Sequence, residues 1–195
     1  MAGHKPNSVR ITGGRWRGRL LHFPSMAGLR PTADVVRERL FNWLGQDLTG
    51  WRCLDLFSGS GALGFEAASR GAAEVWLIER DRLASEALQA SRARIGAENV
   101  RVVRADVMDW LRGTPAEKFD LVMLDPPFSQ GEPVRVLEML PRFLVPGARV
   151  YIEHGGGLVL PAGWHVLRSG RTGQAHYFLL EQGNHDQNSS LSGDV

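Results

Sequence analysis

The sequence predicts an α/β fold, in which an open, mostly parallel β-sheet carries helices on both faces and ends in a C-terminal antiparallel hairpin. From residue 51 onward, short apolar runs typical of buried strands alternate with segments whose apolar residues recur at helical spacing. The links are short, as in repeated βαβ units with right-handed crossovers. A composition of 43% hydrophobic and 23% charged residues over 195 positions is sufficient for one folded domain with an appendage.

The first 48 residues form the predicted appendage. Residues 1–9 are expected to be disordered, and residues 10–48 to form a basic hairpin and a helix. Arg15, Arg17 and Arg19 lie two positions apart, so an extended chain would place them on one face, with Trp16 on the other. The helix follows Pro31, and its apolar positions recur at helical spacing, which predicts that it packs on the main domain.

The main domain is expected over residues 49–182. Asp81 is a candidate N-cap for its second helix, and a proline at position 133 suits the first turn of its last helix. The predicted strands are 52–57, 74–79, 100–104, 119–125 and 148–153, followed by a hairpin of 164–169 and 174–181. The predicted helices are 62–70, 83–95, 107–111 and 133–143. The Ser- and Asn-rich tail, 183–195, is expected to be disordered.

Several classes of protein are disfavoured by the composition. The single cysteine, Cys53, lies in an apolar run typical of a core position, and no Cys/His cluster has the spacing of a zinc site, so no metal is expected. We find neither a membrane-spanning apolar stretch nor the apolar region of a signal peptide. These observations predict a cytoplasmic protein with no membrane partner.

Positive charge is concentrated at the N-terminus. Residues 1–33 hold six basic and no acidic residues, whereas the remainder holds 17 basic and 21 acidic residues. A basic arm on a mildly acidic body predicts a polyanionic partner, although an ordinary flexible basic terminus is the alternative. The candidate nucleic-acid contacts are Arg10, Arg15, Trp16, Arg17, Arg19, Arg30 and Arg37.

The strand predicted at 119–125 ends in Asp125-Pro126-Pro127-Phe128. Asp125 can accept a hydrogen bond from an exocyclic amino group, and Phe128 can stack on a flat ring. Prolines fix φ and donate no N–H, so the neighbouring carbonyls are held as acceptors. An Asp-Pro turn after a strand is the plainer interpretation. These four residues are the candidate catalytic group.

A second group of polar residues lies at the ends of the earlier strands. Residues 59–64 match G-x-G-x-x-G between a strand and a helix, a pattern that is weak alone. Asp55 precedes it and would repel a pyrophosphate but suit a ligand's cationic amino group, while Glu79 is placed to accept ribose hydroxyls. Asp106 can accept from an adenine amino group, cap the helix at 107, or do both.

An amino acid, a ribose and an adenine joined by a sulfonium make S-adenosylmethionine. Asp55 and Glu79 can instead cap their own turns. The candidate cofactor-binding residues are Asp55, Phe57, Gly59, Gly61, Glu79, Arg80, Asp106 and Val107.

In their order, the motifs 55–61, Glu79 and 125–128 resemble the Rossmann-like class I S-adenosylmethionine-dependent methyltransferases that act on exocyclic amino groups. The segments 15–19, 29–32 and 37–44 narrow the resemblance to the bacterial 16S ribosomal RNA guanine-N2 methyltransferase family, over residues 10–181. Val35, where that family often has arginine, is one departure and leaves one basic contact in doubt.

The resemblance implies a seven-stranded sheet with an N-terminal hairpin extension. We also expect the protein to be a monomer. It also implies that the substrate is a guanine (number 966 in the family) of 16S rRNA in an assembled or assembling 30S subunit. Asp125 would position the N2 amino group or accept its proton. The residues alone leave open an enzyme acting on adenine N6 or protein glutamine, a nicotinamide-dependent oxidoreductase, and a non-catalytic RNA-binding assembly factor.

Overall fold

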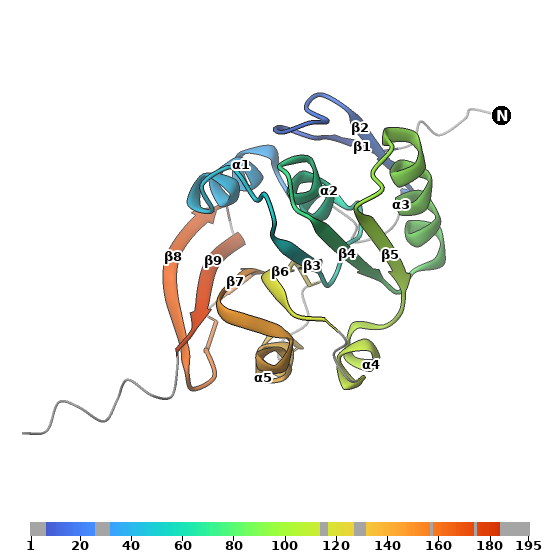
Figure 1. Cartoon of the computed structure of the whole chain (residues 1–195). Coiled ribbons are helices and arrows are strands. Elements are labelled where there is room, and N and C mark those ends of the chain that lie inside the picture. The colour runs from blue at the N-terminus through green and yellow to red at the C-terminus, as the bar shows by residue number, and fades with distance from the viewer. Residues whose placement is uncertain are drawn as a thin grey trace, which may run out of the picture.

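A seven-stranded sheet lies at the centre of the computed structural model, which describes residues 7–25, 32–113, 117–126, 132–156, 158–173 and 175–183 (Figure 1). Its strand order is β5-β4-β3-β6-β7-β9-β8, with five parallel strands followed by the antiparallel pair β9 and β8. This confirms the predicted sheet. The strands are β3 (Arg52–Asp55), β4 (Glu74–Glu79), β5 (Val100–Arg104), β6 (Phe119–Leu124), β7 (Leu144–His154), β8 (Trp164–Thr172) and β9 (Ala175–Gln182).

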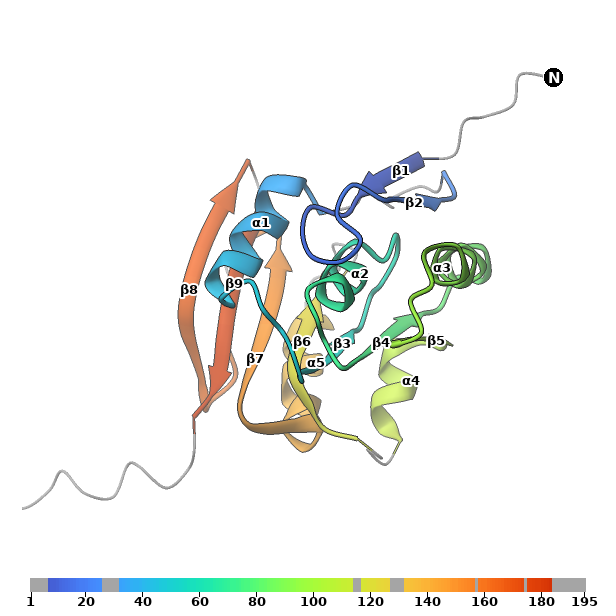
Figure 2. The ribbon, with the colours of Figure 1, turned by 45° about the horizontal axis from the view of Figure 1, so that its top comes forward.

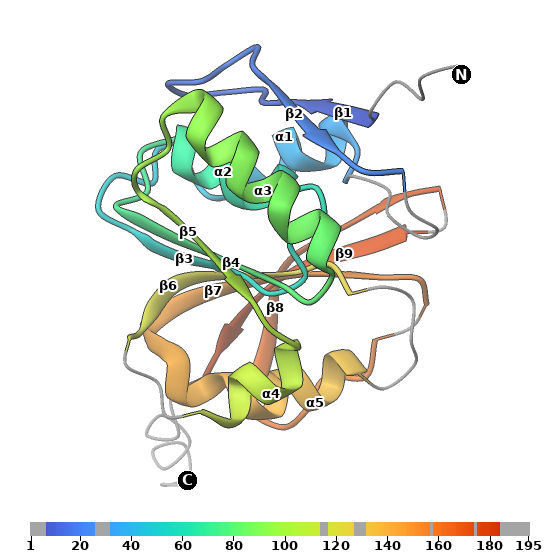
Figure 3. The same cartoon turned by 90° about the vertical axis from the view of Figure 1, so that its right-hand side faces the viewer.

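Helices cover both faces of the sheet (Figures 2 and 3). On one face lie α1 (Asp34–Trp43), α2 (Ala62–Ser69) and α3 (Arg82–Ile95), and on the other α4 (Val107–Arg112) and α5 (Glu132–Met139). Successive residues of a strand point to opposite faces. Leu121 and Met123 of β6 therefore join the core under α1–α3, whereas Val122 and Leu124 join the core over α4 and α5.

Several element boundaries differ from the prediction by a few residues, and two of these differences have a clear local cause. The helix expected over 133–143 ends at Met139 and continues as a 3-10 turn, Leu140–Phe143. Pro141 has no N–H to donate, so the α-helix stops there. Residues 7–9, expected to be disordered, belong to strand β1 (Asn7–Arg10), because it pairs with β2 (Leu20–Phe23) and buries Val9.

The β1–β2 hairpin lies on the α2 side of the molecule (Figure 2) and is anchored by one buried carboxylate. Glu66 of α2, with no exposed surface, accepts hydrogen bonds from the backbone N–H groups of Thr12 (2.8 Å) and Gly13 (2.7 Å). It also accepts from the Thr12 hydroxyl at 2.9 Å and pairs with Arg70 at 2.8 Å. The hairpin is therefore an integral part of the fold.

Close packing against α2 requires a glycine in the hairpin. Gly14 has φ of 73°, and a Cβ there would lie 1.9 Å from the carbonyl oxygen of Ser69. That carbonyl accepts from the N–H of Arg15 at 2.7 Å. Any side chain at position 14 would separate the hairpin from the helix.

The helices of the described residues are short. The longest, α3, has 14 residues, and none of them has the length and apolar character needed to cross a bilayer. Cys53 is fully buried in β3, as the sequence predicts.

Candidate active site

The glycine loop turns the chain sharply from β3 into α2. Gly59 and Gly61 have φ of 48° and 76°, a region that residues with a Cβ seldom adopt. Gly61 is the N-cap of α2, and a Cβ there would lie 2.6 Å from a methyl carbon of Leu88. The loop therefore brings backbone N–H groups and the positive end of the α2 dipole to the carboxyl edge of the sheet.

Asp55 ends β3 as a buried carboxylate with 1% exposure. Its Oδ2 accepts a hydrogen bond from the Gly64 N–H at 3.0 Å. Burial raises the pKa of Asp55 to about 7, and the nearby Glu79 adds to the effect. Among the described residues, no ion pair joins Asp55 to a cation. A cationic amino group of a ligand would supply a counter-charge.

Glu79 ends β4 and connects the glycine loop to the start of α3. Its two carboxylate oxygens accept from the N–H groups of Gly59 and Asp81, both at 2.8 Å. Each oxygen has a further lone pair, so hydroxyls can still bind there. Asp81 caps α3 by accepting from the Ala84 N–H at 2.9 Å, as predicted.

Asp106 is the N-cap of α4. Its Oδ1 accepts from the N–H groups of Met108 (2.9 Å) and Asp109 (3.4 Å). Within the described residues its hydrogen bonds involve Oδ1, which leaves Oδ2 for a ligand. The capping role is thus confirmed, and the adenine role stays a prediction.

The other candidate cofactor residues differ in how deeply they are buried. Val107 is buried in the core over α4 and α5, and Phe57 packs against that core. Arg80 is exposed between β4 and α3. The carboxyl edge thus brings the acidic candidates together, whereas Arg80 points to solvent.

Asp125 follows β6 at the same edge, and Pro126 beside it is buried. The Thr32 hydroxyl donates a hydrogen bond to Asp125 Oδ2 at 3.2 Å. Burial and the neighbouring Glu153 raise the pKa of Asp125 to about 8. The other two candidates of this motif, Pro127 and Phe128, lie outside the described residues.

Sequence reasoning missed Glu153, near the end of β7. Leu124 of β6 pairs with Ile152 of β7 in parallel register, so Asp125 and Glu153 follow side by side. The Tyr151 hydroxyl donates to Glu153 Oε1 at 2.9 Å. A carboxylate at the end of a predicted strand was the signal that identified Asp55 and Glu79, and the same signal was present here.

The basic arm is a turn rather than an extended ladder, which corrects the prediction. The strands end at Arg10 and resume at Leu20, and Gly14 and Gly18, with positive φ, reverse the chain between them. Arg10 at the end of β1 and the turn's three arginines, Arg15, Arg17 and Arg19, are nevertheless all exposed.

Two residues predicted to contact nucleic acid are buried instead. Trp16, 7% exposed, packs into the core, and its backbone N–H donates to the Ser69 hydroxyl at 2.9 Å. Arg37 has no exposed surface, and its Nη2 donates to the Arg10 carbonyl (2.6 Å) and to Asp34 (2.7 Å). Arg37 therefore joins α1 to the hairpin and is not available to contact RNA. Arg30 lies outside the described residues.

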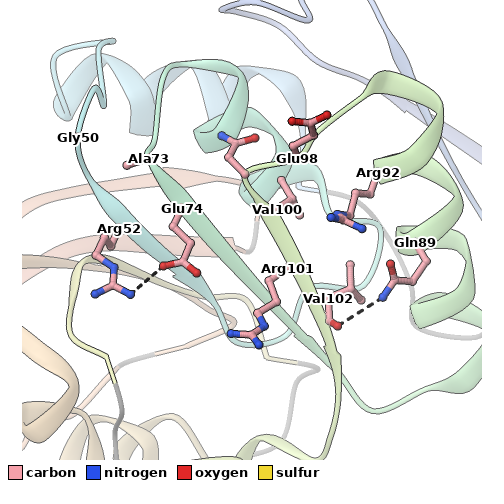
Figure 4. A pocket seen from close by; sticks show the side chains of 11 residues that line it. Gly50, Arg52, Ala73, Glu74, Gln89, Arg92, Glu98, Val100, Arg101 and Val102 are labelled. Carbon is pink, nitrogen blue, oxygen red and sulfur yellow. Dashed lines mark hydrogen bonds and ion pairs between the residues drawn. The ribbon is translucent and has the colours of Figure 1, made fainter.

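A surface hollow lies away from this edge. Its volume is about 730 Å³, and its lining includes the first residues of β3, β4 and β5 with Gln89 and Arg92 of α3 (Figure 4). Arg52 pairs there with Glu74 at 2.7 Å. The hollow contains none of the predicted site residues, so the candidate active site is the carboxyl edge.

Comparisons with known proteins agree with this fold. The family model described as "Conserved hypothetical protein 95" matches residues 9–181. The chain is 43% identical to "Ribosomal RNA small subunit methyltransferase D" of Escherichia coli, with 91% of this chain and 94% of the relative covered. The relative of the same name in Haemophilus influenzae is 37% identical, over 89% and 93% of the two chains.

A solved structure of a putative methyltransferase from Escherichia coli superimposes with a TM-score of 0.82 at 41% identity, covering 91% of this chain and 99% of that one. A putative methyltransferase from Streptococcus mutans, with a TM-score of 0.72 at 15% identity over 92% and 56% of the chains, is similar in fold alone.

Proposed function

We propose that this chain, which belongs to the conserved hypothetical protein 95 family, uses S-adenosylmethionine to methylate the N2 amino group of a guanine in 16S ribosomal RNA. The names of its relatives support methylation of small-subunit ribosomal RNA. The choice of N2, and of guanine 966, rests on the family resemblance. The observation that carries the proposal is the row of carboxylates on adjacent strands, with Asp55 and Glu79 beside the glycine loop and Asp125 next along the sheet.

The acidic residues at the ends of β3–β5 suit the cofactor. Asp55, a buried carboxylate, would pair with its amino group, and Glu79 would accept its ribose hydroxyls. The Oδ2 atom of Asp106 accepts no hydrogen bond from the described residues, and it would accept one from the adenine amino group. When bound, S-adenosylmethionine supplies a methyl group already activated by the sulfonium, so the protein mainly provides orientation and electrostatics.

Asp125 and the Pro126 carbonyl would hold the acceptor nitrogen. The lone pair of guanine N2 is delocalised into the ring, which makes it a poor nucleophile. Hydrogen bonds from N2–H to these two acceptors would fix the nitrogen and stabilise the positive charge that develops on it. Methyl transfer forms the N–C bond, breaks the methyl–sulfur bond and releases a proton, which Asp125 is placed to accept. Phe128, by its place in the sequence motif, would stack on the base.

The acceptor base must leave its stack to reach Asp125, at a cost on the order of a few kcal/mol. The exposed arginines of the hairpin, Arg10, Arg15, Arg17 and Arg19, would offset it by binding the RNA backbone. We further propose that a monomer acts in the cytoplasm on an assembled or assembling 30S subunit. The names of the relatives, which refer to small-subunit rRNA, support that setting.

The test is transfer of a tritiated methyl group to small subunits from cells lacking the enzyme, followed by mapping of the labelled base. Asp125→Ala should lower the rate by about 10²-fold or more, with S-adenosylmethionine binding by calorimetry unchanged. Asp109→Ala, an exposed carboxylate of α4, is the matched control and should keep the full rate. A label on another base would refute the substrate, and an Asp125→Ala enzyme of normal rate would refute the role of that residue.

A further inference from the structure

Two carboxyl groups lie side by side where the acceptor base is proposed to bind. The parallel register that pairs Leu124 with Ile152 places Asp125 beside Glu153 on the next strand. Leu124 and Ile152 both enter the core over α4 and α5, so the next residues point to the opposite face, toward Thr32. The Thr32 hydroxyl donates to Asp125 at 3.2 Å.

In the part of the chain that the structure describes, the side chains that hydrogen-bond these two carboxylates are hydroxyls. The Tyr151 hydroxyl donates to Glu153 at 2.9 Å, and Glu153 lies opposite Tyr177 in the register of β7 and β9. The nearby guanidinium of Arg39 donates to the Tyr177 hydroxyl. No ion pair within the described residues joins either carboxylate to a cation. Among the described residues, Thr32, Asp55 and Tyr151 act on the pair directly, and Tyr177, which accepts from Arg39, lies opposite Glu153.

Electrostatics determine how many protons such a pair carries. Two neighbouring, half-buried carboxylates cannot both be ionised without a large repulsion, so they retain one proton between them. Burial and Glu153 raise the pKa of Asp125, and burial raises that of Glu153, in agreement with this reasoning. Burial and the same carboxylates also raise the pKa of Tyr151, which therefore remains a donor.

We propose that Glu153 is a positioning residue that carries the proton shared with Asp125, so that Asp125 meets the acceptor amine as a carboxylate. The inference rests on the proposed methyl transfer. As the N–C bond forms and the methyl–sulfur bond breaks, the N2–H bond breaks and its proton passes to Asp125. The pair then holds two protons and is neutral, and it returns one to water after the base has left.

Glu153→Gln tests this role because it keeps the shape and removes the ionisable group. With Glu153 replaced by a neutral amide, Asp125 would titrate alone and in one step, so the upper of the pair's two ionisations should disappear from the kcat–pH profile. The maximal kcat should fall, the KM for S-adenosylmethionine should not change, and Glu153→Asp should restore part of the coupling. Glu181→Gln, on β9 and paired with Arg149, is the control and should leave the profile unchanged.

A purely structural Glu153 would give a lower melting temperature and a lower kcat with an unchanged kcat–pH profile, and that result would overturn the proposal. A second measurement needs no activity. In wild-type protein labelled with ¹³C at its carboxyl groups, the Asp125 signal should titrate in two steps. The pKa of the upper step should lie well above the normal range for an aspartate. One normal step would overturn proton sharing even if the enzyme is active. Failure of wild type to methylate small subunits would instead refute the proposed function.

Discussion

Glu66→Ala is expected to release the N-terminal hairpin from the methyltransferase domain. Glu66 and Arg70 have side-chain exposures of 0% and 7%, so water does not replace the interactions that the mutation removes. The N–H groups of Thr12 and Gly13 and the Arg70 guanidinium all lose their acceptor. The hairpin strands keep their own pairing but lose the buried carboxylate that joins them to α2.

The magnitude follows from the burial of this ion pair. Removing one member of a buried, hydrogen-bonded pair costs about 3–5 kcal/mol. For a domain of this size the melting temperature falls by about 2–4 °C per kcal/mol, so the expected decrease is roughly 6–20 °C. Glu86→Ala is the matched control. Glu86 pairs with Arg82 on α3, but both side chains are about 60% exposed, and such a pair contributes about 0–1 kcal/mol.

Urea unfolding of both variants measures the difference, and hydrogen exchange locates it. The backbone N–H groups of β1 and β2 should exchange faster in Glu66→Ala, while those of β3 and β6 keep the protection that the remaining global stability allows. S-adenosylmethionine binding should persist, whereas methyl transfer to small subunits should fall as the arm detaches. If Glu66→Ala is no less stable than Glu86→Ala, the hairpin is not anchored as described.

Three further predictions concern the arm, the acceptor site and the core. Replacing Arg15, Arg17 and Arg19 by Ala should weaken RNA binding and reduce its salt slope by about 0.7–0.9 for each phosphate that is no longer bound, and an unchanged slope would exclude this role. Because the proton that Asp125 shares with Glu153 is held up to a pKa of about 8 in the folded state, above that of an unfolded carboxyl, the native state binds more protons over that interval, and its stability falls as pH rises through it. Asp125→Asn should therefore stabilise the protein more at pH 8 than at pH 5, and equal stabilisation would contradict the assignment. Burial raises the pKa of the Cys53 thiol, so a thiol reagent should react only after unfolding, and rapid labelling of native protein would disagree with its placement.

The sheet could be predicted because each strand carries its own signal. The run 119–124 and the strand 74–79 are continuous and apolar at their centres, and the caps at Asp81 and Asp106 are local interactions between residues two or three apart. Arg37 could not be placed correctly from sequence. An arginine on a helix is usually exposed, and only the packing of the hairpin on α1 places it under the Arg10 carbonyl.

The neighbours of Glu153 in the candidate site could not be predicted from the sequence around it. The position of a carboxylate along its own strand can be read from the sequence, but its neighbours depend on strand order. Because β7 lies next to β6 in parallel register, Glu153 reaches Asp125, 28 positions earlier in the chain. Thr32 reaches the same carboxylate from 93 positions away. The acceptor site is therefore a property of the topology, and substitutions that shift the β6–β7 register should alter the titration of Asp125 before they alter cofactor binding, which we propose to involve Asp55 and Glu79.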